Sequence, residues 1–565
     1  MKFAIARHAS TMSASVLLLG AMFGAPTFAA SPPTIACGDL TAARIGTEQL
    51  SITSAITVKS DERTPTPHCV LQGTLEQRIG VDGKQYAIGF ELRLPDAWNG
   101  RYFHQANGGG DGEVVPAYGQ LLGGGATRNA LTLGYAVLSS DAGHDGKAFP
   151  EYGLAGGSAF GLDPQARLDY GYQSTPKLFR LAQDVLKAYY GRAQDYSYMV
   201  GCSNGGRHAM IAASRYPRLF HGILAGAPGF DLPRAALKGP SDTQSVLKNG
   251  LEIRSAFSRE DLQLVSREIV RACDMLDGAA DEMVADLKAC QKAFDLKSLQ
   301  CTGEKSPSCL STAQVPTLQG IMAGPRTSDG KQLYPTFPFD PGIASANWRF
   351  WRLESTIPPW ERYPLTTTLG SGSLAMIFTT PPTKVEGKPA ALLKFQAEFD
   401  LDKDAQKILA TSGPFTESAL DFMSPPDRDD PKLAEFKQAG GKMIMFHGHS
   451  DGPFSINATI NWYETLEKNN AGDARSFVRF YPIPGMAHCS GGPATDRIEL
   501  FAALVDWVEK GKATDTPIAS ARAENVELPP SWSKERTRPL CNWPLVARYS
   551  GSGDLEKAES FSCRP

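Results

Sequence analysis

The sequence lacks the features that mark metal-cluster, nucleic-acid-binding and membrane proteins. Its ten cysteines form no C-x-x-C pair and no Cys/His run with zinc-ligand spacing, which argues against a metal cluster. Lysine plus arginine number 57 and aspartate plus glutamate 60, so a net charge of -3 offers no cationic surface for phosphate backbones or anionic lipid. We therefore expect neither nucleic acid nor a membrane as partner.

A long apolar run is also missing beyond the first thirty residues. That segment (1–30) carries two basic residues, an apolar run over 16–23 and small residues over 25–30, the layout of a secretory signal peptide. The alternative, a membrane anchor, needs a longer run. We predict cleavage near Ala29 or Ala30 and a secreted or periplasmic mature protein.

Export places the cysteines where thiols stay oxidised, and their even number favours disulfides. Short separations suggest four pairs and leave Cys202 and Cys489 for a fifth, although separation alone does not settle connectivity. Two buried free thiols are the alternative for that last pair. The four suggested pairs are Cys37 with Cys69, Cys273 with Cys290, Cys301 with Cys309, and Cys541 with Cys563.

Strand and helix patterns alternate along the chain, which predicts an α/β architecture with a largely parallel sheet. At 565 residues and 42% hydrophobic composition, the chain is long enough for more than one folding unit. Residues between 230 and 431 are rich in Pro, Ser and Gly, hold four cysteines and show few strand patterns. Strands are expected at 135–138, 198–200, 442–446 and 477–481, with a helix at 207–213.

One pentapeptide suggests nucleophilic catalysis. Gly201-Cys202-Ser203-Asn204-Gly205 fits the G-x-S-x-G nucleophile elbow, in which glycines let the chain turn sharply and expose the serine hydroxyl. An ordinary glycine-rich turn is the alternative, but the motif stands between a predicted strand and a predicted helix. Ser203 is therefore the candidate nucleophile.

A serine nucleophile needs a base and a group that orients the base. In α/β-hydrolases the chain order is Ser, Asp or Glu, then His, with the last two in loops after late strands. Asp451 and His488 satisfy both conditions. His447 and His449 compete for the role of base, but only His488 follows the last strand. The prediction is an α/β-hydrolase core formed by residues 31–230 and 432–565, with a lid domain inserted at 231–431.

Acyl transfer also needs donors for a developing oxyanion. One is normally the backbone N–H after the nucleophile, here Asn204. The second is expected from the glycine-rich stretch 105–112, at Asn107 or Gly108. A phosphate-binding loop is the rival, but no Lys-Ser/Thr follows the glycines.

An acidic stretch in the predicted lid, residues 273–283, clusters carboxylates around a glycine turn, a composition that calcium prefers. Its spacing is not that of an EF-hand. A solvated acidic turn is the alternative.

The elbow with its Cys-Ser pair, Asp451 and the His488-Cys489 pair together resemble the tannase and feruloyl esterase family. The resemblance implies hydrolysis of esters of aromatic acids such as ferulate or gallate, free or polymer-linked. It also implies structural calcium held by Asp274, Asp277 and Asp281 and by the carbonyls of Ala279 and Met283. The family's glycine after the third aspartate is Glu282 here.

The resemblance further implies that Trp351 and Phe454 wall an aromatic acyl pocket, with core packing as the alternative for each. The stretches 161–169 and 485–493 are most similar to enzymes that hydrolyse mono(2-hydroxyethyl) terephthalate, which is the alternative substrate. Those enzymes have a lid arginine for the free carboxylate; the matching stretch 365–369 has none, and Arg362 lies nearby. A secreted protein that binds aromatic ligands or glycans on the same fold is the alternative from another class.

Overall fold

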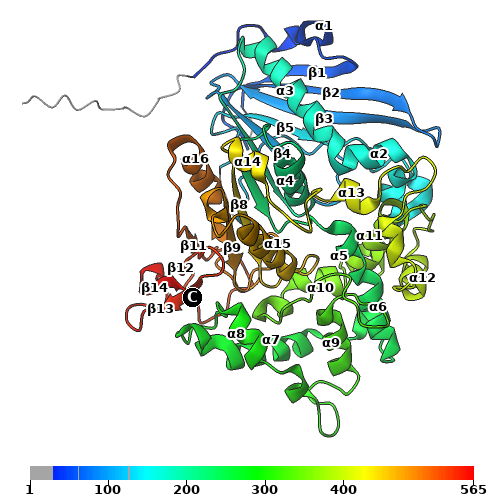
Figure 1. The fold of residues 1–565 in the computed structure, drawn as a ribbon, viewed down its shortest axis with the longest axis vertical. Helices are drawn as coiled ribbons and strands as arrows, with labels where there is room; N and C mark the ends of the chain where they lie inside the picture. The colour runs from blue at the N-terminus through cyan, green and yellow to red at the C-terminus, as the bar shows by residue number, and fades with distance from the viewer. Residues whose placement is uncertain (1–29, 61–62, 125–127) are drawn as a thin grey trace, which may run out of the picture.

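The computed structural model describes residues 30–60, 63–124 and 128–565. The predicted signal peptide lies almost entirely outside them. A sheet of nine strands, in the order β1-β2-β3-β5-β4-β6-β7-β8-β9, runs through the molecule (Figure 1). Its strands are β1 (Leu50–Val58), β2 (His68–Ile79), β3 (Gln85–Pro95), β4 (Arg101–Ala106), β5 (Ala136–Ser140), β6 (Tyr196–Cys202), β7 (Gly222–Gly226), β8 (Lys442–Gly448) and β9 (Val478–Ile483).

The sheet is mostly parallel, as predicted. Neighbours from β5 through β4 to β9 pair in parallel, whereas β1, β2 and β3 pair antiparallel and β3 joins β5 antiparallel. The parallel strands share one carboxyl edge, so the residues that follow β4, β6 and β8 meet there. The fold is α/β, as the sequence predicts.

Each face of the sheet is covered by helices. Because successive strand residues point to opposite faces, Met199 packs in the core that includes α3 (Ser174–Tyr190), α4 (Asn204–Arg215) and α15 (Ile456–Asn469). Its neighbour Tyr198 packs in the other core, with α16 (Leu500–Lys510). These layers hold the parallel strands between two apolar faces, which fixes the positions of the loops at the carboxyl edge.

A long insertion separates β7 from β8, which pair directly in the sheet. It contains helices and no strand of the main sheet among its described elements, and several of its helices lie below the sheet in Figure 1. The division into a lid domain at 231–431 stays a prediction. The α-helices between β7 and β8 are α5 (Leu232–Ala236), α6 (Lys238–Lys248), α7 (Arg259–Cys273), α8 (Leu287–Ala293), α9 (Gln314–Ala323), α10 (Ala346–Arg352), α11 (Leu365–Ser373), α12 (Pro389–Glu398), α13 (Ala419–Met423) and, beyond the predicted lid boundary, α14 (Ala434–Gln438).

The remaining α-helices and strands are short. Two small helices are α1 (Ala42–Ile45) and α2 (Pro164–Leu168). The C-terminal segment forms two small sheets, one of β10 (Arg497–Ile498), β11 (Ile518–Ser520) and β12 (Thr537–Pro539) and one of β13 (Val546–Tyr549) and β14 (Phe561–Arg564). The second sheet lies beside the insertion, where Arg548 pairs with Asp286 at 2.8 Å.

Five disulfides cross-link the chain, and they join the same five pairs that the sequence suggests. They connect Cys37 with Cys69, Cys202 with Cys489, Cys273 with Cys290, Cys301 with Cys309, and Cys541 with Cys563. In the described part of the chain, none of the helices combines the length and the apolar character needed to span a bilayer.

Candidate active site

Ser203 stands on a sharp turn between β6 and α4. Its backbone has a φ of 65°, a conformation that L-residues rarely adopt, and its N–H donates to the carbonyl of Gly226 at 3.0 Å. The turn needs its glycines: a Cβ at Gly205 would lie 2.2 Å from the carbonyl oxygen of Ala106, and one at Gly201 would lie 2.5 Å from the backbone of Gly205. The local sequence thus permits the turn that presents the Ser203 hydroxyl.

His488 joins Ser203 to Asp451 in one hydrogen-bonded chain. His488 Nε2 lies 2.8 Å from Ser203 Oγ, and His488 Nδ1 lies 2.6 Å from Asp451 Oδ2. The three predicted residues come from loops after β6, β8 and β9 and meet at the carboxyl edge of the sheet. A serine, a histidine and a carboxylate in this order and at these distances can generate an alkoxide nucleophile.

Asp451 is held as an anion by its surroundings. Burial acts to raise its pKa, but the charges and hydrogen bonds of His488 and His447 outweigh burial and hold that pKa well below its usual range. Its second oxygen accepts the Phe454 N–H at 2.7 Å. His447 lies 3.3 Å from the carboxylate, and His449 instead faces Asp340. Of the three candidate histidines, His488 is the one that contacts Ser203.

The glycine-rich loop after β4 packs against the nucleophile. A Cβ added to Gly108 would lie 3.8 Å from Ser203 Cβ, and the Asn107 amide donates to Ser139 Oγ and the Ser140 carbonyl at 3.0 and 2.8 Å. As the first residue of α4, Asn204 has a backbone N–H that no residue within the helix can accept. The structure therefore brings the residues predicted as oxyanion donors to Ser203.

A buried network beneath this loop was not predicted from the sequence. Asp111 Oδ2 accepts from the Asn204 amide at 2.7 Å and lies 2.8 Å from His208 Nε2. Arg207 donates to the Asn204 side-chain oxygen at 2.6 Å. Burial and the nearby Arg207 charge lower the pKa of His208. Asp111 thus ties the glycine-rich loop to the start of α4, and its place in the stretch 105–112 was the only sequence signal for it.

The Cys202–Cys489 disulfide joins the residue before Ser203 to the residue after His488. It adds a covalent link to the hydrogen bond between the two side chains, so the elbow and the histidine loop cannot separate freely. Small displacements of reacting groups are costly in rate, and the link limits them.

Two aromatic rings flank His488. The Trp351 ring, on α10 of the insertion, lies 5.2 Å from the imidazole centroid, and the Phe454 ring lies 5.5 Å from it. Phe454 is buried and Trp351 partly exposed. Both predicted pocket residues are therefore beside the catalytic candidates. Arg362 pairs with Glu354 at 2.7 Å, and its side chain is 69% exposed.

The predicted calcium residues lie between α7 and α8. Burial, and then the charges of Asp281 and Asp274, raise the pKa of Asp277 to about 7. Arg538, however, already forms an ion pair with Asp281. Across the described residues, no group of three or more His, Cys, Asp or Glu side chains is arranged to hold a metal ion. Calcium at these residues, which also include the carbonyls of Ala279 and Met283, stays a prediction.

Serine, histidine and aspartate at the carboxyl edge of a mostly parallel sheet define a serine hydrolase arrangement. The sequence model of the family described as tannase and feruloyl esterase matches residues 74–564. The chain belongs to this family of carboxylic ester hydrolases.

Relatives and solved structures agree with the family. The chain is 40% identical to a mono(2-hydroxyethyl) terephthalate hydrolase of Piscinibacter sakaiensis, over 88% of this chain and 84% of that protein. It is 29% identical to a probable feruloyl esterase of Arthroderma benhamiae, over 89% and 87%. Feruloyl esterase B from Aspergillus oryzae has the same fold, with a TM-score of 0.72 at 23% identity over 94% of this chain and 99% of that one.

Proposed function

We propose that this protein hydrolyses esters of aromatic acids through an acyl-enzyme formed on Ser203. The observation that carries the proposal is the continuous chain from Ser203 Oγ through His488 to Asp451. His488 Nε2 takes the serine proton as Oγ attacks the ester carbonyl, while Asp451 accepts the Nδ1 proton in a hydrogen bond and stabilises the imidazolium. His488 then gives the proton to the departing alcohol.

Water completes the reaction by the same path. His488 removes a proton from water, the hydroxide attacks the acyl carbonyl, and the aromatic acid leaves with Ser203 restored. The backbone N–H groups of Asn204 and of Asn107 or Gly108 serve as donors to the oxyanion in both steps. Asp111 holds the two donor segments together through the Asn204 side chain.

Two acyl groups are candidates. The 40% identity to a mono(2-hydroxyethyl) terephthalate hydrolase favours the terephthalate monoester, and we take it as the first substrate. Ferulate and gallate esters, favoured by the sequence motifs, are the second. Arg362 adds no support for the terephthalate monoester, because its guanidinium pairs with Glu354.

Initial rates on mono(2-hydroxyethyl) terephthalate, methyl ferulate and methyl gallate test the proposal and rank the candidates. The control is Ser203→Ala, which keeps the backbone and removes the nucleophile. Turnover retained by that variant would refute the mechanism. A protein that cleaves none of the three and does not label with a serine-directed phosphonate would instead be a binding protein on the same fold.

We also propose that the protein works outside the cytoplasm, because five disulfides are typical of oxidising compartments. Calcium stays a separate proposal. It is supported by the three aspartates Asp274, Asp277 and Asp281 between α7 and α8 and opposed by the Arg538–Asp281 pair. No step of the reaction above depends on it.

A further inference from the structure

Asp340 is a buried carboxylate of the insertion that contacts both of the loops carrying Asp451 and His488. Its exposed fraction is 0%. Ser450, the residue before Asp451, donates from Oγ to Asp340 Oδ1 at 2.5 Å. The backbone N–H of Gly485, on the way from β9 to His488, donates to Asp340 Oδ2 at 3.4 Å. One side chain of the insertion therefore spans the two loops that supply the base and its orienting carboxylate.

The chain that follows Asp340 is pressed between the same two loops. Asp340 precedes a short 3₁₀-helix (Pro341–Ala344), and its Oδ1 accepts the Gly342 N–H at 3.0 Å. A Cβ added to Gly342 would lie 2.4 Å from the Gly485 carbonyl oxygen and 2.7 Å from Ser450 Cβ. Atoms do not pack that closely, so a side chain here would have to move one of the loops. A helix cap alone would be an ordinary structural role, but this one sits in contact with both catalytic loops.

The insertion contacts these loops at two further points, both from α10. The Asn347 side-chain oxygen accepts the backbone N–H of His488 at 3.3 Å. Arg352 donates to the carbonyl of Gly452, the residue after Asp451, also at 3.3 Å. Each half of the His–Asp pair is thus supported from the insertion, and Asp340 is the residue that supports both.

Small errors in the placement of reacting groups are costly, since a misplacement of about 1 Å can lower a rate about a hundredfold. We propose that Asp340 is a positioning residue for ester hydrolysis, which fixes the spacing of the two loops so that the 2.6 Å hydrogen bond between His488 and Asp451 is kept. It acts through Ser450 and Gly485 and not on the reacting atoms. The inference rests on the hydrolytic function proposed above, and it makes the insertion part of the catalytic apparatus.

Two substitutions remove these contacts with little change of shape. In Asp340→Asn one oxygen becomes an NH₂ group, so whichever way the amide turns, the N–H of Gly342 or of Gly485 faces a donor. Ser450→Ala removes the hydroxyl contact and leaves Asp340 in place. We expect each variant to lower kcat about tenfold and to keep KM within about twofold, because alignment is lost while the groups that bind the ester are unchanged.

Gly342→Ala tests the same spacing without removing any hydrogen-bonding group. The added methyl has to displace the Gly485 carbonyl or Ser450, and we expect it to lower kcat about tenfold or more. Labelling of Ser203 by a serine-directed phosphonate should slow in the same proportion in all three variants, since the reaction of the serine hydroxyl needs the same base. A merely structural weakening would lower the melting temperature but leave the labelling rate of the folded protein unchanged.

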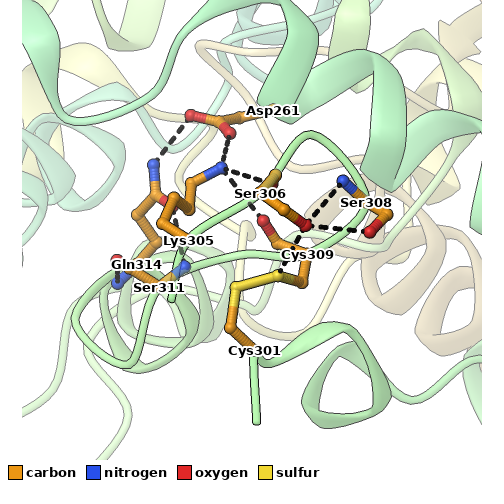
Figure 2. Close-up of a disulfide and its surroundings, with 8 residues drawn as sticks. All are labelled: Asp261, Cys301, Lys305, Ser306, Ser308, Cys309, Ser311 and Gln314. Atoms are coloured by element: carbon orange, nitrogen blue, oxygen red, sulfur yellow. Dashed lines mark hydrogen bonds and ion pairs between the residues drawn. A yellow bond between two sulfur atoms is a disulfide. The ribbon is translucent and has the colours of Figure 1, made fainter. Parts of the chain in front are cut away.

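Asp261→Asn is the matched control. Asp261 is also a buried aspartate of the insertion, at 7% exposure, and it accepts the Ser258 N–H at the start of α7. Its remaining hydrogen bonds come from Lys305 and Gln314, as Figure 2 shows. Because these contacts lie within the insertion, we expect the control to lose stability and to keep kcat within about twofold of the wild type.

Initial rates on 4-nitrophenyl acetate and on the fastest of the three esters named above, with melting curves for every variant, decide the matter. A kcat within about twofold of the wild type in folded Asp340→Asn and Ser450→Ala, or an equal loss in Asp261→Asn, would overturn the inference. If Asp340→Asn does not fold, an unchanged kcat in Ser450→Ala is sufficient to overturn it. A wild-type protein that cleaves no ester and takes no phosphonate would refute the proposed hydrolysis and this inference with it, whereas an active wild type with unaffected variants would refute this inference alone.

Discussion

Replacing Cys202 and Cys489 together by serine should cost more stability than removing any shorter cross-link, and should also slow catalysis. The Cys202–Cys489 disulfide closes a loop of 287 residues, and the Cys301–Cys309 disulfide one of 8. In the chain-entropy model these correspond to about 5–6 and about 2–3 kcal/mol of unfolding free energy. The difference of about 3 kcal/mol is the quantity to test, because errors common to both variants cancel.

The Cys301→Ser/Cys309→Ser variant is a suitable control. Figure 2 shows that this loop keeps other ties: Lys305 donates to Asp261 at 2.6 Å and to the Cys309 carbonyl at 2.9 Å. It lies in the insertion and contributes no residue to the site. Guanidinium unfolding of the wild-type protein and both variants gives the free energies.

Kinetics separates a structural from a positioning effect. Without the Cys202–Cys489 link, the direct tie between Ser203 and His488 is their 2.8 Å hydrogen bond. We expect kcat to fall by roughly ten- to a hundredfold with KM little changed, since misplacement by about 1 Å can cost a hundredfold. The control variant should keep the wild-type kcat. Equal stability losses in the two variants, or an unchanged kcat without the Cys202–Cys489 link, would refute the reasoning.

Four further outcomes are expected. Asp451→Asn should lower kcat by about 10⁴-fold while the protein stays folded, because the imidazole loses its orienting anion; a loss below tenfold, from the same initial-rate assay, would argue against the role. Burial, and then the charge of Arg352, lower the pKa of Lys238 to about 7, although Asp242 opposes this shift. The ordinary pKa of a lysine, taken for the unfolded chain, is 10.5. Because the unfolded state then binds more protons, unfolding free energy should rise from pH 7 to 10, and Lys238→Met should abolish that rise in urea titrations. Trp351→Ala should raise KM for aromatic esters about tenfold and leave acetate esters nearly unaffected; a parallel change in both would point to packing. If calcium is bound, a chelator should lower the melting temperature and added calcium restore it, whereas an unchanged melting curve and no calcium by metal analysis would exclude it.

Local patterns predicted the part of the fold that carries the chemistry. The expected strands at 135–138, 198–200, 442–446 and 477–481 correspond to β5, β6, β8 and β9, and the expected helix at 207–213 lies within α4. Each is an apolar run that ends at a polar loop, so its period and its end are both visible in the sequence. The chain order of Ser203, Asp451 and His488 then predicted that these three residues meet at one edge of the sheet.

Contacts between distant segments could not be predicted from local sequence patterns. The antiparallel strands β1 to β3 carry mixed polar and apolar residues and were not predicted. Asp111 stands 93 residues before Asn204, and its importance depends on a hydrogen bond that no spacing rule encodes. The same holds for Arg538, whose ion pair with Asp281 brings the C-terminal segment onto the predicted calcium cluster.

The origin of Trp351 has a consequence for how this family diversifies. Ser203, His488 and Asp451 are supplied by loops of the sheet, whereas Trp351 reaches the same imidazole from a helix of the insertion. If Trp351 walls the acyl pocket, as we propose, mutations in that helix would change which acid is accepted while leaving the reacting groups in place. Two members of the family could then share most of their sequence and still differ in the acids that they accept. We would expect the sequence differences that separate them to include positions of α10.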